Sequence, residues 1–340
     1  MLKRLGFAKT RVSGKQKQPY MIIAIDETGD FSPQSDKLSF FVAVLIDQQN
    51  GSVGVKHHQF VEWLTTLPKE KFNCNSEVKG SDLSDEELLA FVKQVYNSDP
   101  IIRCEVVCMQ PNENPEDLML TFKEIEVSKI SRLAELASED GKEEMAKQYN
   151  RMAIWHKNAK KMHYPHFFKL ILLRSIIVQA FNTAIGVSIL LESLGDNNSD
   201  NLLNIQFKID QDFVRGDDPT IYWKELLRTH FISKTIQNPI PVLDSWKEME
   251  HPFLRKYKSE KDGTLNFNDL FKQSCNFVQS HEHFEVQIAD IVGIIINRFH
   301  NRDRAVEAYK ELWTRIQRPT FTKISLNANP DTNIEPEIIE

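Results

Sequence analysis

The chain has 340 residues, of which 41% are hydrophobic and 26% are charged, the composition of a soluble globular protein large enough for a substantial core. It contains no run of about 18 apolar residues, and its basic start lacks the apolar segment of a signal peptide, so we expect neither a membrane span nor secretion. The formal net charge of −6 argues against a strongly basic nucleic-acid-binding surface. The net charge is a weaker argument against nucleic-acid binding if the protein has an acidic metal site, because bound cations would neutralise the negative charge of that site.

Charge is unevenly distributed along the chain. Residues 1–18 contain six basic residues and no acidic one, which leaves −12 for the rest of the chain. A basic arm can bind phosphates, but it is also typical of a solvated, disordered terminus, and we favour the second interpretation. We therefore expect a flexible arm at 1–18, one domain at 19–318 and a C-terminal tail at 319–340.

The four cysteines, Cys74, Cys104, Cys108 and Cys275, lack the paired spacing of a zinc site. Cys104 and Cys108 are separated by an even number of positions within a predicted strand. We expect all four to be buried thiols of a protein in the reducing cytosol, and therefore a cytoplasmic location.

The N-terminal third predicts two strands, at residues 20–26 and 38–46, that pair as an antiparallel hairpin. Helical spacing follows at 56–67. Ser84 and Glu87 have the spacing of a capping box, which predicts a helix from that point to about Tyr96. A further strand is expected at 101–109.

From residue 115 to about 185 the pattern becomes helical, with breaks at Gly141 and Pro165. We expect a helical insertion here, made of three helices at about 116–138, 142–162 and 164–183. The third helix is apolar throughout, so it should return to the core. Later elements are predicted from the same patterns: strands at 187–191, 202–210 and 275–278, and helices at 217–232, 285–300 and 304–317.

The first strand ends in acidic residues, because the β-branched run at 22–25 leads directly into Asp26, Glu27, Thr28, Gly29 and Asp30. Side chains alternate along a strand, so Asp26 shares a face with Ile22 and Ala24, whereas Ile25 faces the other way. A carboxylate at the end of a core strand needs a cation or hydrogen bonds to offset its desolvation. The same residue types are also ordinary in a turn after a strand.

A second acid lies on a late apolar helix, where Gln287 and Asp290 are three residues apart and share one face. The partner of Asp290 would be metal ions or a structural Lys or Arg. Together with Asp26, Glu77 and Asp210, it makes four acids on separate elements, the ligand set of a two-metal phosphodiesterase. Such carboxylates repel one another, so we expect dependence on two Mg²⁺ or Mn²⁺ ions.

Three motifs resemble a known family. The segments at 25–30, 77–80 and 287–292 are similar, in order, to the D-E-S-G-D, E-x-K-G and Q-x-A-D-L motifs of the bacterial domain of unknown function 3800. The resemblance covers about residues 20–300. It implies an α/β protein with an RNase H-like mixed sheet flanked by helices, and it is compatible with a bacterial defence or mobile-element setting. It also implies the same ligand set, since RNase H-like folds take their acids from the first strand, a helix start, the fourth strand and a late helix.

Two positions depart from the pattern or have a competitor. Thr28 stands where the family usually has Ser. No motif marks the third acid. We assign it to Asp210 from the position of this residue on a strand, and Asp212 is the alternative. We expect five further residues to support the ligands: Glu27, Asp30, Lys79, Gln287 and His283.

Some of these supporting roles have alternatives. Asp30 could only fix the turn, and Lys79 could pair with Glu77 instead of touching a phosphate. His283, or its neighbour His281, could act as a proton shuttle before the late helix.

These features predict a metal-dependent nuclease that hydrolyses phosphodiester bonds of DNA or RNA. The alternative is a catalytically inactive RNase H-like module that binds nucleic acid or a protein partner. The sequence also leaves open whether the protein forms a homo-oligomer. The chain has no Gly-Lys-Ser/Thr phosphate-binding loop, and Thr28 stands where a haloacid-dehalogenase phosphatase needs a second Asp.

Overall fold

A computed structural model describes twelve stretches of the chain: 21–32, 35–47, 52–97, 103–109, 115–158, 164–193, 205–211, 240–241, 264–265, 275–313, 320–325 and 337–339. The arm expected at 1–18 and the helix expected at 217–232 lie outside these residues.

The described strands form a central mixed sheet in the order β7-β4-β1-β2-β3-β8-β9. Their bounds are β1 (Met21–Thr28), β2 (Ser39–Asp47), β3 (Arg103–Met109), β4 (Ile205–Asp210), β7 (Cys275–Val278), β8 (Thr320–Ser325) and β9 (Glu337–Ile339). β1 pairs antiparallel with β2 and parallel with β4, so the predicted hairpin and the mixed α/β sheet are confirmed. Two short strands, β5 (Ile240–Pro241) and β6 (Thr264–Leu265), pair separately.

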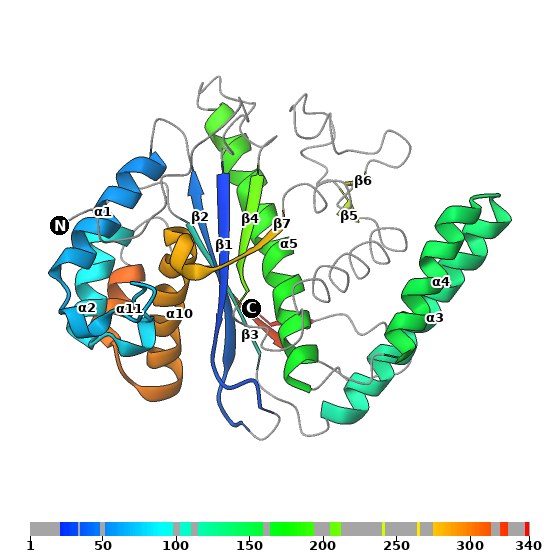
Figure 1. Cartoon of the computed structure of the whole chain (residues 1–340), viewed down its shortest axis with the longest axis horizontal. Helices are drawn as coiled ribbons and strands as arrows, with labels where there is room; N and C mark the ends of the chain where they lie inside the picture. Colours follow the sequence, from blue (N-terminus) through cyan, green and yellow to red (C-terminus); the bar gives the residue numbers. More distant parts are fainter. Residues whose placement is uncertain are drawn as a thin grey trace.

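Helices cover both faces of this sheet (Figure 1). One face carries α1 (Ser52–Thr66), α2 (Asp85–Phe91), the π-helical turn η5 (Val92–Tyr96), α10 (Phe284–Arg302) and α11 (Val306–Trp313). The other face carries α5 (Tyr164–Ser193), which packs on β2 and β3. Alternation along β2 explains the two layers: Val42 lies 3.7 Å from a β-carbon built at Gly293 of α10, whereas the Phe41 ring meets Phe31, which in turn meets Phe168 of α5.

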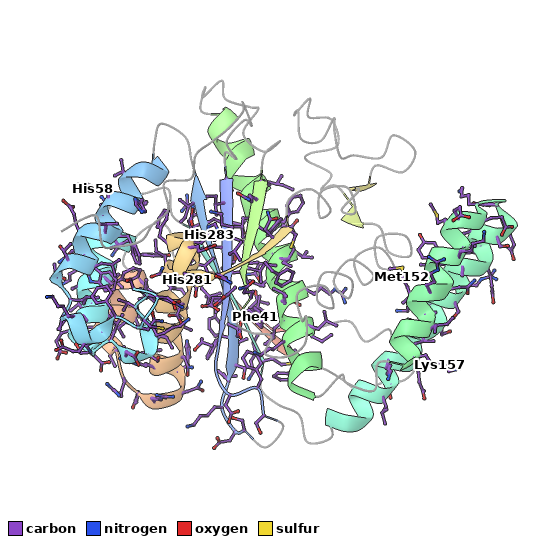
Figure 2. All side chains as sticks on the ribbon, viewed as in Figure 1. Phe41, His58, Met152, Lys157, His281 and His283 are labelled. Carbon is purple, nitrogen blue, oxygen red and sulfur yellow. The ribbon has the colours of Figure 1, made fainter. Side chains whose placement is uncertain are left out.

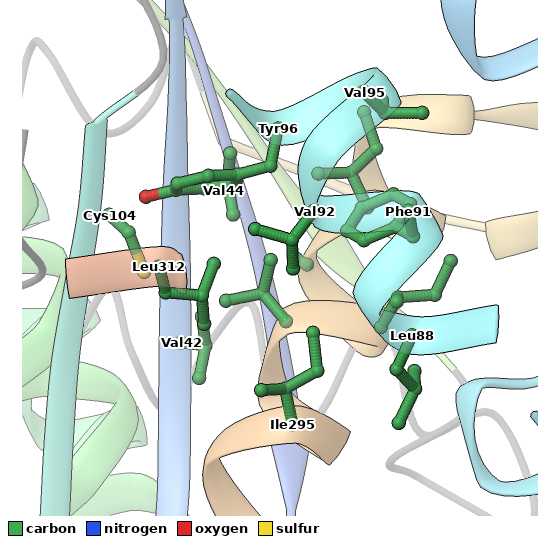
Figure 3. Packing of buried hydrophobic residues seen from close by; sticks show 14 of the residues in the cluster. Val42, Val44, Leu88, Phe91, Val92, Val95, Tyr96, Cys104, Ile295 and Leu312 are labelled. Carbon is green, nitrogen blue, oxygen red and sulfur yellow. The ribbon is translucent and has the colours of Figure 1, made fainter. Parts of the chain in front are cut away.

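The main core lies between the sheet and the α10 layer. Figure 3 shows Val42, Cys104 and Ile295 in this cluster with apolar side chains of α2, η5 and α11. Each large side chain that is fully buried here contributes about 1.5–3 kcal/mol to folding. The predicted capping box is confirmed, because Ser84 accepts the Glu87 N–H and the Glu87 side chain accepts the Ser84 N–H.

The helix α5 is apolar and long enough to span a membrane by composition, over Phe168–Gly186 with a mean hydropathy of 1.4. Of this window, 61% is buried inside the protein, where it covers the sheet. This burial favours a core helix, as the sequence predicted. The strand predicted at 187–191 is wrong, because α5 continues to Ser193. A short apolar run has no periodicity that separates a strand from a buried helix.

The other two helices of the insertion form a hairpin, α3 (Pro115–Glu139) and α4 (Glu143–Asn158), that projects away from the sheet (Figure 1). Gly141 closes it with a φ of 70°, a left-handed conformation that glycine adopts without strain. The hairpin has a small core of its own, which includes Leu133 and Tyr149. The prediction of three helices with a returning third helix is therefore confirmed.

Two further expectations are wrong. The segment predicted as a tail at 319–340 contains β8, which pairs parallel with β3, and β9, which pairs antiparallel with β8. The β8 sequence lacks the strict polar–apolar alternation that would have marked a strand. The expectation that all four cysteines are buried is also wrong, because Cys74 is exposed and Cys275 is only partly buried. Cys104 and Cys108 are buried, and all four are free thiols.

An acidic cluster between the sheet and helix α10

Two acids of the cluster come from neighbouring parallel strands. Ile25 of β1 pairs with Ile209 of β4, so the next residues, Asp26 and Asp210, lie side by side where the pairing of these two strands ends. Both are buried, with 7% and 4% of their surface exposed. Their negative charges are close enough that Asp210 raises the pKa of Asp26.

The third acid, Asp290, is placed by the packing of α10 on β1. Asn297 donates a hydrogen bond of 2.8 Å to the Thr28 hydroxyl, and Gly293 lies against the same side chain. Asp290 is one helical turn before Gly293, which puts it over the acidic end of β1. Its charge also raises the pKa of Asp26. A Ser at position 28, as in the resembling motif, would keep the hydroxyl.

The fourth acid, Glu77, is held against α10 by the residues that follow it. The Gly80 N–H donates a hydrogen bond of 2.8 Å to Asp290 Oδ2. A β-carbon at Gly80 would lie 2.8 Å from Ile294 Cγ1 and 3.2 Å from Ile291 Cα, so only glycine permits this approach. The Glu77–Gly80 segment is therefore packed against α10, and its last residue is hydrogen-bonded to Asp290 of that helix.

Glu77 is buried and already engaged by hydrogen-bond donors. Lys79 Nζ lies 2.8 Å from Oε1, the Ser280 hydroxyl donates to the same oxygen, and Asn73 Nδ2 donates to Oε2 at 2.9 Å. Burial alone would raise the pKa of Glu77, but these hydrogen bonds and the Lys79 charge lower it. Gln287 contributes indirectly, because its amide donates to the Ser280 carbonyl at 3.0 Å.

Among the described residues, Asp26 and Asp290 have fewer hydrogen-bond donors than Glu77. Among the described residues, Asp26 accepts a single hydrogen bond, from the Glu27 N–H at 2.8 Å. Burial, and then the charges of Asp210, Asp290 and Glu27, raise its pKa well above the usual range. Burial also raises the pKa of Asp290 to about 6, although the Gly80 hydrogen bond and the Lys79 charge oppose this shift.

The structure assigns other roles to two of the predicted supporting acids. Glu27 forms an ion pair of 2.8 Å with Lys169 of α5, whose ammonium lies 4.9 Å from the centroid of the Phe31 ring. Asp30 is exposed and accepts the Ser32 N–H, as expected if it only fixes the turn. Asp212, the competitor of Asp210, lies outside the described residues.

His283 is part of a separate polar group beside the cluster. Lys208 Nζ lies 3.2 Å from His283 Nδ1 and 2.9 Å from Glu285 Oε1. An ammonium can only donate, so Nδ1 accepts the hydrogen bond. Burial and the Lys208 charge lower the pKa of His283. Figure 2 shows His281 and His283 near the sheet, far from the hairpin marked by Met152 and Lys157.

The sequence did not indicate Ser280 and Lys169 as members of this region. Lys169 is flanked by apolar residues in α5 and Ser280 lies in a polar stretch, and each meets its carboxylate from an element distant in the chain. No local spacing marks such contacts, because only the packing of α10 and α5 on the sheet creates them.

The donor atoms of the cluster suit a hard divalent cation. They are carboxylate oxygens, which Mg²⁺ and Mn²⁺ prefer, and burial followed by neighbouring negative charges raises the pKa of Asp26. In the described part of the chain, no group of three or more His, Cys, Asp or Glu side chains is already arranged to hold a metal ion. Coordination of a cation would require the carboxylates to move.

Comparisons of the chain with protein-family models, with curated proteins and with solved structures give no match. The resemblance of the three motifs to the domain of unknown function 3800 therefore stays a prediction.

Proposed function

We propose that this protein is a divalent-metal-dependent nuclease. The observation that carries the proposal is the meeting of Asp26, Asp210 and Asp290, from two parallel strands and one helix, in a buried cluster whose negative charges raise the pKa of Asp26. Water-poor surroundings make such repulsion strong, and a divalent cation would relieve it. The three aspartates would hold the cation.

A cation bound here would activate water for attack on a phosphodiester and stabilise the leaving oxygen. The chain's own residues would prepare that chemistry. Gly80 orients Asp290 through its N–H, and the Glu27 N–H orients Asp26. Glu77, Lys79 and Ser280 form the hydrogen-bonded border of the cluster. The substrate would be DNA or RNA, and we propose that the protein acts in the cytoplasm.

An RNase H-like fold is part of the same proposal. The mixed sheet is flanked by helices, and the acids lie on the first strand, before the helix α2, on the fourth strand and on the late helix α10. This order of elements is the one that the motif resemblance implies.

A second candidate is a catalytically inactive module of the same fold that binds nucleic acid or a protein. One observation favours it: no described group of acids is already arranged for a metal, and Glu77 is paired with Lys79. In that case the acids would serve as ion-pair partners within the fold.

A cleavage assay separates these two candidates. Single- and double-stranded DNA and RNA are incubated with the full chain and Mg²⁺, Mn²⁺ or EDTA. The nuclease predicts cleavage that EDTA, Asp26→Asn and Asp290→Asn abolish, whereas Glu86→Gln, at an exposed acid of α2, leaves it intact. Binding without cleavage, unchanged by metal and by these variants, would support the inactive module.

A further inference from the structure

The imidazole of His283 lies at the end of a buried ion pair. Lys208 Nζ of β4 and Glu285 Oε1 of α10 are 2.9 Å apart, and their side chains are only 10% and 6% exposed. The same ammonium lies 3.2 Å from His283 Nδ1, whereas Glu285 Oε2 is 4.0 Å from that nitrogen. The charge nearest to the ring is therefore the positive charge of the lysine.

These distances determine where the ring can hold a proton. An ammonium has three N–H donors and no acceptor, so its contact with the ring needs a lone pair on His283 Nδ1. The second proton of an imidazolium would have to sit on that same nitrogen, directly against the charge of Lys208, and this form is disfavoured. The neutral ring then carries its one proton on Nε2.

Other ionisable groups act on the ring less strongly than burial and Lys208. The carboxylates of Glu285 and Glu282 raise the pKa of His283, and His281 lowers it. Burial is the largest cause and Lys208 the next, and both lower this pKa, so that it lies below its ordinary value. The contacts and the surrounding charges therefore agree on a neutral ring.

The other ring nitrogen, Nε2, is available to a ligand. Of the residues that the structure describes, none forms a hydrogen bond with His283 Nε2, and the side chain is 30% exposed. Lys208 is two residues before Asp210 and shares its face of β4, so the ring lies beside the proposed nuclease site.

We propose that Lys208 holds His283 as a neutral imidazole protonated on Nε2, and that His283 serves the substrate as a fixed hydrogen-bond donor instead of a proton shuttle. The acceptor would be an oxygen of the nucleic-acid backbone, which receives about half to two-thirds of protein–DNA hydrogen bonds. A shuttle must change its protonation near the working pH, and the ammonium beside Nδ1 opposes that change. The donor role rests on the proposed nuclease function, whereas the protonation state of the ring does not.

Nitrogen NMR of the full chain, with ¹⁵N-labelled histidine, tests the protonation state without metal or substrate. The signals that His283→Gln removes should show a protonated Nε2 and an unprotonated Nδ1 at pH 7. The double variant Lys208→Met/Glu285→Gln removes the ion pair without leaving a buried charge unpaired. In this variant the pKa of His283 should rise towards the ordinary value of about 6.5.

Cleavage by two variants separates a donor from a shuttle. Glutamine has an N–H near the position of Nε2 but takes up no proton near neutral pH, so His283→Gln should stay within about threefold of the wild type from about pH 6 to 8. His283→Ala has no donor and should lose about tenfold or more. A shuttle would cost both variants equally, by about a hundredfold or more. His58→Gln, at an exposed histidine of α1, is the matched control and should leave cleavage unchanged.

Three results would overturn the inference: a protonated Nδ1 in the wild type at pH 7, an unchanged His283 pKa in the folded double variant, or equal losses of cleavage in His283→Gln and His283→Ala. The wild-type spectrum decides the protonation state even if the double variant does not fold. A wild type that cleaves neither DNA nor RNA is a different failure. It would remove the proposed nuclease function and the donor role with it, but not the protonation state that the NMR spectrum shows.

Discussion

Gly293 of α10 lies directly against Thr28 of β1: a β-carbon built at Gly293 would be 3.3 Å from Thr28 Cγ2. One turn later, Asn297 donates to the Thr28 hydroxyl. Together these contacts set the height and rotation of α10 on the strand. Because Asp26 and Asp290 lie two residues and one turn away, the same contacts set how close the two acids come.

Replacing Gly293 by Val should push α10 away from β1. We expect a loss of about 1–3 kcal/mol in the free energy of unfolding, measured by urea denaturation, because the added methyls meet a packed strand. Gly186→Ala is the matched control, since nothing lies within 4 Å of a β-carbon there and alanine favours the helix by up to about 1 kcal/mol. A Gly293→Val protein of wild-type stability would contradict this account of the packing.

Asp26→Asn should stabilise the protein in the absence of divalent cations. The charge it removes is buried and faces Asp210 and Asp290. We expect a gain of about 1–2 kcal/mol at pH 8, with loss of cleavage and of Mn²⁺ binding. Thermal denaturation in EDTA measures the gain. A clear loss of stability would instead identify Asp26 as a structural ion-pair partner.

The pH dependence of stability follows from Asp290, whose pKa is about 6 in the folded protein. An unfolded Asp has a pKa near 4, so between about pH 4 and 6 the folded chain binds more protons than the unfolded chain. The contribution of Asp290 therefore favours folding below about pH 4 and is lost as the pH rises towards 6.

Urea denaturation at a series of pH values checks this sign. Asp290→Asn should flatten the decline over that window by about 1–3 kcal/mol relative to the wild type. Mn²⁺ affinity should change in the opposite sense, increasing as the pH rises through about 6, because the cation needs the ionised carboxylate. Identical pH profiles for the wild type and Asp290→Asn would refute the assignment of this pH dependence to Asp290.

An ion pair between a buried arginine and a partly exposed aspartate, away from the cluster, gives a prediction on stability alone. Arg298 is 6% exposed, and its guanidinium donates to Asp85 at 2.9 Å and to the Ser81 carbonyl at 2.9 Å. Asp85→Ala would leave that charge unpaired, with an expected cost of about 2–3 kcal/mol, reduced by the partial exposure of Asp85.

Chemical denaturation of Asp85→Ala and of the double variant Asp85→Ala/Arg298→Met tests this prediction. The double variant should recover part of the loss, because it removes the unpaired charge. Glu86→Ala, at the exposed neighbouring position, should change stability by less than about 0.5 kcal/mol. An equal cost for Glu86→Ala would show that the ion pair is not the cause.

Most of the strands, the insertion and the positions of the acids could be predicted because local sequence patterns indicate them. The run before Asp26 is a short continuous apolar segment bounded by turn residues, and the helix around Asp290 has apolar residues at helical spacing. The strands at 320–325 and 337–339 could not be predicted from local sequence. The first lacks a strict polar–apolar alternation and pairs with β3, far away in the sequence, and the second pairs only with the first.

Local sequence patterns could not predict which side chains contact each acid. Whether Lys79 meets a phosphate or Glu77 depends on Ser280, which reaches the same carboxylate from the other end of the chain. The pairing of Glu27 with Lys169 depends in the same way on how α5 crosses the sheet. Such contacts follow from tertiary packing, for which spacing in the sequence has no signature.

The separation of β1 and β4 in the chain has a consequence for synthesis on the ribosome. The strands β1, β2 and β3 emerge early and can pair at once, but the free edge of β1 must wait until the α3–α4 hairpin and α5 have been made. An unpaired edge is open to wrong partners, and quick burial of one sheet face by α5 would limit that exposure. Since α10 emerges later still, a truncated nascent chain cannot assemble the four acids.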